Sequence, residues 1–220
     1  MSTSVATGVT VSGSALTHRY GRRATGIIAL EFSFDGPGAI AVTGPNGSGK
    51  STLLRIMAGL LRPTEGSTGV VVSGHALAPD QRRRAIGLAT PELSFYEEFT
   101  ATENLCFAGE THGLADPVRA AGQALDLVGL SPRASDKVAA YSSGMKQRLR
   151  LAFALVHEPP LLMLDEPGSH LDDAGRAAVR AVIARQAERG LVLIATNDPQ
   201  EIQLAERALA LHGRGLGDPS

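Results

Sequence analysis

The sequence GPNGSGKST spans residues 44–52 and fits the pattern of a phosphate-binding loop, G-x-x-x-x-G-K-[ST]. Its residues are Gly44, Pro45, Asn46, Gly47, Ser48, Gly49, Lys50, Ser51 and Thr52. Glycines let the backbone N–H groups of such a loop curl around an anion, and a following helix N-terminus adds partial positive charge. Lys50 can then reach the β- and γ-phosphates, and the Ser51 hydroxyl is a ligand for Mg²⁺.

The segments on either side of this loop supply the context that the motif requires. Residues 39–43 are apolar and partly β-branched, which predicts a buried strand, and residues 53–58 predict a helix. A glycine-rich turn that contains Gly-Lys by chance is the alternative, but it does not explain the strand and the helix. The sequence therefore predicts a nucleotide phosphate site between them.

Composition limits the possible classes of protein. The chain has 220 residues, a hydrophobic content of 43% and a formal net charge of −1, as expected for one large or two small α/β domains. This charge gives no electrostatic reason to expect nucleic acid as a partner. No apolar run approaches the roughly 20 residues of a membrane span. We see no secretion signal in residues 1–10, and Cys106 has no second cysteine to pair with, so we expect a cytosolic protein.

The secondary structure predicted along the chain changes from strands to helices and then returns to strands. Before residue 90, strands are predicted at 9–11 with 15–16, at 27–34, at 70–72 and at 86–89, and the run 82–84 reads as a solvated charged surface. From Pro91 to about Leu155 the pattern is helical. Thr100 and Glu103 have capping-box spacing, and Asp116 before Pro117 is typical of a helix start.

Two carboxylates follow a short apolar run further along the chain. Residues 161–164 read as a buried strand that ends directly at Asp165 and Glu166. Ligands of open α/β sheets bind beyond the carboxyl ends of the strands. Asp165 is therefore placed to hold Mg²⁺, and Glu166 to orient or deprotonate a water. A chance acidic turn is common after a strand, but the phosphate loop supplies the context for a catalytic role.

Taken together, these motifs resemble those of ATP-binding-cassette (ABC) ATPases over nearly the whole chain. Residues 44–52 resemble the family's Walker A motif, residues 161–166 its Walker B motif with Glu166 in the place of the catalytic glutamate, and residues 168–172 its D-loop. The signature region is YSSGMKQR at 141–148, where the family usually has LSGGQ-x-Q-R. The resemblance implies that Ser142, Ser143 and Gly144 contact the nucleotide; Ser142 and Gly144 match the pattern, whereas Ser143 and Met145 depart from it.

This resemblance implies the fold and its division. We expect a P-loop NTPase core with a mixed or parallel sheet, an N-terminal antiparallel β portion and a helical insert. Residues 1–220 would form a single ABC ATPase domain, with the core at 1–90 and 156–220 and the helical subdomain at 91–155. Tyr20 lies where the family stacks an aromatic ring on adenine, although a tyrosine at a strand end is more often simply half-buried.

The chain departs from the family pattern at two further positions. The family usually has a glutamine between the core and the helical insert, but residues 89–94 contain none, and Glu92 is the nearest candidate for that metal-side position. The family also has a switch histidine after the last core strand, and Asn197 stands in its place. Asparagine still donates a hydrogen bond, but it is shorter and neutral at all pH. Tolerated variation and altered hydrolysis both stay open as explanations.

The resemblance also implies a mechanism and partners. Two subunits, in a homodimer, would bind ATP and Mg²⁺ head to tail, each nucleotide lying between one phosphate loop and the other subunit's signature. The dimer would drive a multi-span membrane permease from the cytoplasmic face of the membrane, with the helical insert and the Glu92 region in contact with it. The short chain is similar to the ATPase subunits of compact exporters, including the haem-exporter type linked to cytochrome c maturation.

Three classes of function fit such a sequence. The first is a transporter ATPase with a separate permease. The second is a soluble ABC ATPase that remodels a protein or nucleic-acid complex, and the tandem cassettes, coiled-coil inserts or basic extensions frequent in that class are not seen here. The third is a P-loop kinase for a small metabolite, which would leave residues 141–148 and the helical insert unexplained. A multi-span membrane protein as genetic neighbour or co-purifying partner would distinguish the first class from the second.

Overall fold

The computed structural model describes residues 8–21 and 24–212, which form two β-sheets with helices. One sheet is antiparallel, with the order β2-β1-β4-β5. Its strands are β1 (Val9–Tyr20), β2 (Ala24–Asp35), β4 (Glu65–Val72) and β5 (His75–Ala76). The other is parallel, with the order β6-β7-β8-β3-β9. Its strands are β3 (Gly38–Thr43), β6 (Ile86–Ala89), β7 (Leu161–Asp165), β8 (Leu191–Ala195) and β9 (Arg207–Ala210).

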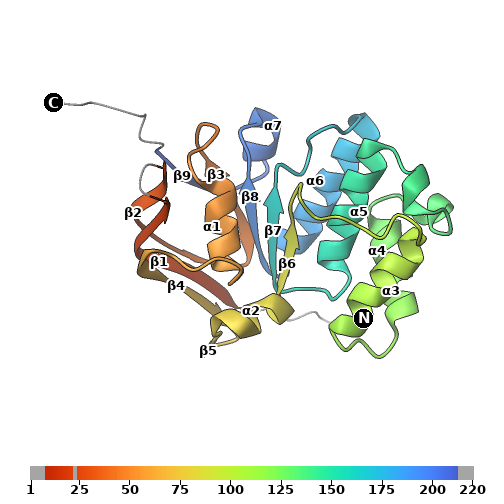
Figure 1. Ribbon diagram of the computed structural model, residues 1–220, viewed down its shortest axis with the longest axis horizontal. Coiled ribbons are helices and arrows are strands. Elements are labelled where there is room, and N and C mark those ends of the chain that lie inside the picture. The colour runs from red at the N-terminus through yellow and green to blue at the C-terminus, as the bar shows by residue number, and fades with distance from the viewer. Residues whose placement is uncertain (1–7, 22–23, 213–220) are drawn as a thin grey trace.

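The helices surround the parallel sheet and extend from one end of the molecule. They are α1 (Lys50–Met57), α2 (Pro79–Ala85), α3 (Ala101–Thr111), α4 (Pro117–Leu127), α5 (Ser143–Leu155), α6 (Asp173–Ala187) and α7 (Pro199–Ile202), with 3-10 turns at Ser131–Arg133 and Val138–Ala140. Figure 1 shows the antiparallel sheet at one end, the parallel sheet in the middle and α3, α4 and α5 at the other end. The α/β class with an N-terminal antiparallel portion is confirmed.

The central parallel strands β7 and β8 are almost entirely apolar because both of their faces are covered. On β7, Leu161 and Met163 join the hydrophobic cluster that includes α1, whereas Leu162 and Leu164 join the cluster that includes α5 and α6. Successive side chains of a strand point to opposite faces, so a strand buried on both sides has no polar position in its sequence. This burial explains why the short run before Asp165 is continuous and does not alternate.

Helix α1 lies between the two sheets. It contacts β2 and β4 of the antiparallel sheet, and β7 and β8 of the parallel sheet. Leu53, Leu54, Ile56 and Met57 are its fully buried apolar side chains. The antiparallel sheet therefore covers the helix that follows the phosphate loop and holds that helix against the parallel strands.

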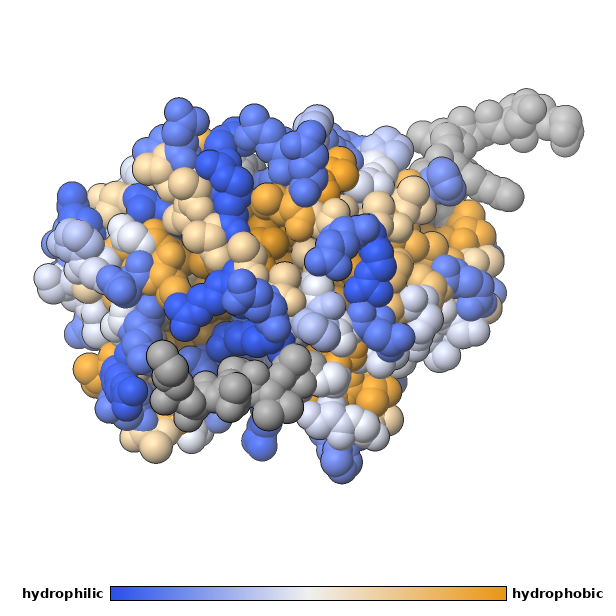
Figure 2. Space-filling view, turned by 180° about the vertical axis from the view of Figure 1, so that it is seen from behind, coloured by the Kyte–Doolittle hydropathy of each residue, from blue (hydrophilic) through white to orange (hydrophobic). Residues whose placement is uncertain are grey.

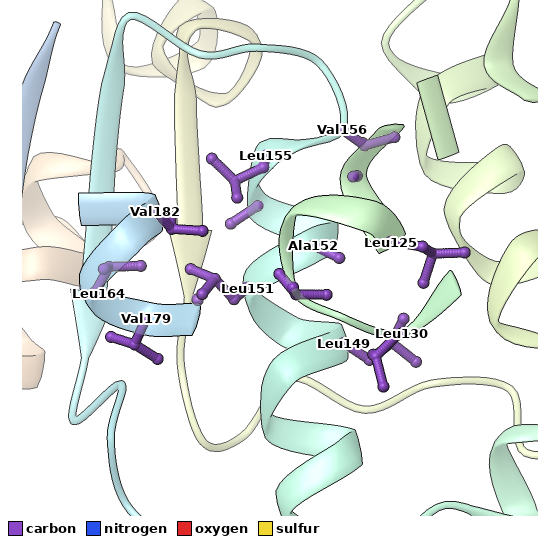
Figure 3. Packing of buried hydrophobic residues seen from close by; sticks show 14 of the residues in the cluster. Leu125, Leu130, Leu149, Leu151, Ala152, Leu155, Val156, Leu164, Val179 and Val182 are labelled. Carbon is purple, nitrogen blue, oxygen red and sulfur yellow. The ribbon is translucent and has the colours of Figure 1, made fainter. Parts of the chain in front are cut away.

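The helical segment shares its core with the parallel sheet. Figure 3 shows Leu125 of α4 and Leu149, Leu151 and Leu155 of α5 in one cluster with Leu164 of β7 and Val179 and Val182 of α6. Every buried side chain in this set removes apolar surface from water at about 25 cal/mol per Å². The division into a core and a helical subdomain at 91–155 stays a prediction, since one continuous cluster joins the two.

The helix starts predicted from the sequence are confirmed. The Thr100 hydroxyl accepts a hydrogen bond from the Glu103 N–H at 3.1 Å, and the Glu103 carboxylate accepts one from the Thr100 N–H at 2.7 Å. The Asp116 carboxylate accepts from the Arg119 N–H at 3.0 Å, with Pro117 at the first helical position. These contacts satisfy backbone donors that a helix start otherwise leaves without partners.

Some predicted boundaries differ from the structure. The opening strand predicted from residues 9–11 with 15–16 is confirmed as β1, which continues to Tyr20, whereas β4 begins at Glu65, ahead of the predicted 70–72. Pairing with β1 extends β4, since Ser67 lies opposite Ser14 and Gly69 opposite Ser12 in the antiparallel register. Residues with weak strand propensity are thus ordered by their neighbours.

The outer surface mixes hydrophobic and hydrophilic residues. On the face shown in Figure 2, hydrophobic patches are interrupted by hydrophilic ones. Among residues 8–21 and 24–212, none of the helices combines the length and the apolar character that crossing a membrane demands.

The interpretation of residues 82–84 as a solvated surface is wrong for Arg82, which is 4% exposed. Its guanidinium donates to the Thr68 carbonyl at 2.7 Å, to the Thr68 hydroxyl at 2.8 Å and to the Met57 carbonyl at 3.3 Å. Arg82 therefore joins α2 to β4 and to the last turn of α1, which the local run of charges could not indicate.

We predict that Arg82→Ala destabilises the protein by about 2–4 kcal/mol, because it leaves buried carbonyls without donors and opens a cavity. Arg84→Ala, which removes an exposed arginine of the same helix, should change the free energy of unfolding by less than about 0.5 kcal/mol. Urea denaturation of both variants measures the difference. Equal stability of the two would show that the Arg82 contacts contribute nothing.

Candidate nucleotide-binding site

The phosphate loop joins β3 to α1 at the carboxyl end of the strand, and its glycines are required by the backbone. Gly44, Gly47 and Gly49 have φ values of 145°, 81° and 102°. A Cβ on Gly49 would lie 2.5 Å from the Gly26 carbonyl oxygen, and one on Gly44 would lie 2.4 Å from that of Leu211. Gly47 has nothing within 4 Å of an added Cβ, so this side of the loop faces open space. Glycine alone fits both the dihedral angles and the close contacts.

Lys50 places a positive charge inside the curve of the loop. The residue is 6% exposed, and its Nζ donates to the Gly44 carbonyl at 2.8 Å and to the Pro45 carbonyl at 3.4 Å. The Ser48 Oγ is buried without a hydrogen-bond partner among the residues that the structure describes. Burying charged and polar groups is costly unless they find partners. The loop therefore fits a bound phosphate, which would supply acceptors for both side chains.

Asp165, at the end of β7, lies close to Ser51, which follows Lys50 at the start of α1. Asp165 is 3% exposed, and its carboxylate lies near the Ser51 side chain. Burial raises the pKa of Asp165, and the negative charges of Glu166 and Glu92 raise it further, against the lowering effects of Ser51 and Arg55. A cation beside Asp165 would relieve this unfavourable burial. A hydroxyl and a carboxylate are oxygen ligands of the kind that Mg²⁺ prefers, so the pair fits that ion.

Glu166 directs an exposed carboxylate into the same space. Its φ is 48°, an uncommon value for a residue with a side chain, and its N–H donates to the Ala195 carbonyl at 2.8 Å. A cavity of about 410 Å³ brings several of the predicted residues together, but Asp165 and Asn197 are not among those that line it. Its lining consists of Tyr20, Gly26, Asn46, Gly47, Gly49, Lys50, Ser51, Thr52 and Glu166.

Tyr20 stands at the edge of this cavity with part of its ring free. It is 46% exposed, its hydroxyl lies 2.9 Å from the Thr52 hydroxyl, and its ring packs edge-on against His18 at 4.6 Å between centroids. The hydrogen bond and the histidine fix the orientation of the ring. An exposed aromatic face fixed in this way is suited to stacking on a nucleotide base.

Asn197 contacts the phosphate loop directly. Its Nδ2 donates to the Asn46 Oδ1 at 3.1 Å, although the two residues lie 151 positions apart in the chain. The preceding Thr196 continues from β8, and its N–H donates to the Val42 carbonyl of β3 at 3.1 Å. The structure thus brings Asn197 to the phosphate loop, and its role at a γ-phosphate stays a prediction.

Glu92 does not line this cavity. Its carboxylate forms an ion pair with the Arg55 guanidinium of α1 at 2.6 Å, and it lines a separate groove with Thr90 and Leu93. Burial acts to raise the pKa of Glu92, but hydrogen bonds from its own backbone N–H and from Arg55 outweigh burial and leave the pKa below the ordinary value. Its role as a metal ligand stays a prediction. Arg55 is a partner that the sequence did not indicate.

Ser142, Ser143 and Gly144 lie at the start of α5 and are absent from the lining of the phosphate-loop cavity. The Ser142 hydroxyl caps the helix by accepting from the Met145 N–H at 3.2 Å. Within a single chain, the signature residues and the phosphate loop are therefore not parts of one cavity.

Gln147 links the signature helix to the catalytic strand, a contact that the sequence analysis missed. This residue is 7% exposed, and its Nε2 donates to the carbonyls of Glu166 at 3.3 Å and Pro167 at 3.2 Å. Its position in the Q-R pair of the signature pattern was the only available signal.

Residues 29–169 match the family model described as ABC transporter. The chain belongs to this family. It is 33% identical over 83% of its length to a linearmycin resistance ATP-binding protein, LnrL, of Bacillus subtilis, and it covers 59% of that protein. It is 40% identical over 75% of its length to the cytochrome c biogenesis ATP-binding export protein CcmA of Xylella fastidiosa, and it covers 73% of that one.

Solved structures of ABC cassettes share the fold of the family member described here. The dimeric cassette MJ0796 bound to ADP and Pi matches with a TM-score of 0.82 at 23% identity, over 93% of this chain and 97% of that one. An ATP-binding subunit of an ABC transporter matches with a TM-score of 0.79 at 27% identity, over 92% and 85%. The chain spans between 52% and 59% of the length of three Bacillus subtilis relatives that it matches.

We predict that Lys50→Ala weakens ATP binding by roughly tenfold or more, because a charge-assisted hydrogen bond to phosphate is lost. Equilibrium binding of a fluorescent ATP analogue measures the loss. Lys137→Ala, at an exposed position of the helical segment, is the matched control for the removal of one positive charge. Unchanged ATP affinity and turnover in Lys50→Ala would refute the assignment of the loop.

Proposed function

We propose that this chain is the ATP-binding and ATP-hydrolysing subunit of an ABC transporter, which dimerises on MgATP and powers a separate membrane permease. The observation that carries the proposal is the separation of the phosphate-loop cavity from Ser142 and Gly144. A nucleotide held by both sets of residues needs two copies of the chain. Membership of the ABC family supports the same arrangement.

The first half of the site holds the nucleotide. Tyr20 offers an exposed ring to the adenine, and the loop N–H groups with Lys50 neutralise the phosphates. The hydroxyl of Ser51 and the carboxylate of Asp165 would hold Mg²⁺, which would supply further positive charge to the phosphate oxygens. On this proposal, Lys50 leaves its two loop carbonyls and takes phosphate oxygens as acceptors, which are stronger partners for an ammonium.

Hydrolysis requires a base beside the terminal phosphate, and Glu166 is placed for that role. Its exposed carboxylate faces the cavity and accepts the proton of a water whose oxygen attacks the γ-phosphorus. The bond between that phosphorus and the leaving ADP oxygen breaks as the new bond forms. Asn197 donates a hydrogen bond near the γ-phosphate, and Gln147 holds the Glu166 peptide from behind.

The second half of the site comes from the partner copy. Ser142 uses its oxygen to cap α5, which leaves its O–H free to donate to a phosphate of the nucleotide on the other subunit. The start of this 13-residue helix adds partial positive charge. Closing two copies head to tail would therefore surround the triphosphate with donors from both chains.

A groove between the core and the helical segment is the proposed contact for the permease. It has a volume of about 370 Å³ and apolar walls that include Leu60, Leu93 and Phe153, with Glu92 at its rim. Beside the helical segment, Tyr96 is exposed and packs against Phe99 and Phe107 at centroid distances of 5.3 and 6.0 Å. Exposed aromatic clusters are typical of partner-binding surfaces. A permease docked here would place the subunit on the cytoplasmic face of the membrane.

A soluble ABC ATPase that acts on a protein or nucleic-acid complex is the alternative class. Co-purification from detergent-solubilised membranes distinguishes the two, because only a transporter subunit should retain a multi-span membrane protein. The relatives' names refer to linearmycin resistance, cytochrome c biogenesis and, at 36% identity, import of aliphatic sulfonates. Such a range favours the shared ATPase role over any one cargo, and the haem-exporter type is one candidate among them.

We predict that Glu166→Gln forms a stable dimer in MgATP, because the variant keeps the shape of the site but removes the base. Light scattering coupled to size exclusion, with and without MgATP, measures the change in mass. A matched control is Glu166→Gln combined with Lys50→Ala, which should form much less dimer at the same MgATP concentration because it binds the triphosphate more weakly. Monomeric Glu166→Gln in saturating MgATP, or turnover equal to that of wild type, would contradict a homodimeric ATPase.

We predict slow but measurable basal hydrolysis in the wild type, and an increase in kcat in Asn197→His with nearly unchanged nucleotide affinity. A longer donor reaches the γ-phosphate in the transition state, where one positioned hydrogen bond is worth roughly 10²–10³ in rate. Steady-state kinetics at equal dimer occupancy test this, with Asn197→Ala as the variant that lacks any donor. If kcat of Asn197→His stays equal or falls, asparagine is the working equivalent of histidine in this chain.

A further inference from the structure

A buried carboxylate close to the site has no part in the mechanism above. Glu201 lies in α7, which Figure 1 shows beyond the end of β8, and it is 6% exposed. Its Oε1 accepts a hydrogen bond from the Gly168 N–H at 2.6 Å, across 33 positions of sequence. Gly168 is the second residue after Glu166, at the start of the loop 168–172 that leads to α6.

The contact explains why residue 168 is glycine. The φ of Gly168 lies outside the left-handed region, so its backbone would accept a side chain. A Cβ there would lie 2.3 Å from the Glu201 Oε1, and the next nearest atoms, also on Glu201 and on Arg176, would be 3.4 and 4.0 Å away. Space at this position is therefore limited mainly by one carboxylate oxygen.

Glu201 is also joined to the segment that presents Asn197. Its carboxyl lies near the Thr196 side chain, and the Thr196 hydroxyl accepts a hydrogen bond from the Asp198 N–H at 2.9 Å. The Asp198 carboxylate forms an ion pair with Arg176 of α6 at 3.0 Å. Residues 196–201 thus form a turn fixed on both sides of Asn197.

Burial of the Glu201 carboxylate is energetically unfavourable. Burial raises the pKa of Glu201, as does the charge of Asp198, while Thr196, the Gly168 N–H and Arg176 act in the opposite direction. Desolvation of this group is offset only by the hydrogen bonds and charges that join the two segments. Glu201 therefore links the loop 168–172 to residues 196–198, although its carboxylate loses hydration there.

We propose that Glu201 is a positioning residue that couples Asn197, at the nucleotide, to the loop 168–172 of the same subunit. The proposal rests on the proposed function, in which Asn197 faces the γ-phosphate. When the nucleotide moves the 196–198 turn, the hydrogen bond to the Gly168 N–H carries the movement to this loop. The same bond holds the backbone that follows Glu166, so it also limits the range of positions open to the catalytic carboxylate.

Kinetics of the full-length chain test the coupling. We expect Glu201→Ala to lower kcat by about tenfold, the effect of one lost hydrogen bond to a charged group, with the KM for MgATP within about twofold of wild type. Glu201→Gln keeps an oxygen acceptor for the Gly168 N–H and should restore most of kcat. Gln200→Ala, at the exposed neighbouring position of α7, is the matched control and should behave as wild type.

The glycine provides a reciprocal test. Gly168→Ala alone should lower kcat, because its methyl group displaces the Glu201 carboxylate. Added to Glu201→Ala, the same change should cause no further loss, since the group that it meets is gone. Additive losses in the double variant, or wild-type kcat in Glu201→Ala, would overturn the proposal.

Amide hydrogen exchange of the nucleotide-free chain separates this proposal from the proposed function. Glu201→Ala should increase exchange at Gly168 and in residues 196–198 by roughly tenfold or more, whereas Gln200→Ala should not. Unchanged exchange in Glu201→Ala would refute the coupling. Faster exchange in a chain whose wild type neither hydrolyses ATP nor dimerises would support the link between the segments and refute the ATPase assignment.

Discussion

A buried ammonium held only by uncharged oxygen atoms is the constraint that the fold must satisfy at the phosphate loop. Among the residues described, the Lys50 Nζ has hydrogen bonds to the Gly44 and Pro45 carbonyls and no ion pair. Such a group is poorly compensated, and it stays in place because α1 is held between two sheets by its apolar face. The antiparallel sheet thus stabilises a site that favours an anion.

The Asp165 carboxylate carries the opposite charge and is also buried with few compensating contacts. Asp165 is buried at the end of β7 with a raised pKa, so the fold places an under-compensated carboxylate and an under-compensated ammonium at one edge of a parallel sheet. A ligand that combines phosphates with a divalent cation satisfies both. Parallel strands explain the proximity, because β3 and β7 both flank β8 and end at the same edge.

The sequence predicted those features whose causes are local. Strand β7 could be predicted because both its faces are buried, which makes its sequence a continuous apolar run. The helix starts at Thr100 and Asp116 could be predicted because N-capping acts over three residues. The contacts of Arg82 and Gln147 could not, since their partners lie 14 and 19 positions away and depend on how whole elements pack. Roles assigned to Glu92 and Tyr20 came from resemblance, and neither position has a local pattern that would fix its contacts.

Continuity between the helical segment and the sheet bears on how two nucleotide sites communicate. Helix α5 begins at the signature residues, packs its apolar face against β7 and α6, and donates through Gln147 to the Glu166 carbonyl. In the proposed dimer, the start of α5 contacts the nucleotide of the partner copy. Gln147 instead contacts Glu166, the general base of its own subunit. A packed helix moves as a unit, because interfaces of this density shift between discrete arrangements and do not deform gradually. In the proposed dimer, the hydrogen bonds of Gln147 would therefore link the occupancy of one site to the geometry of the other.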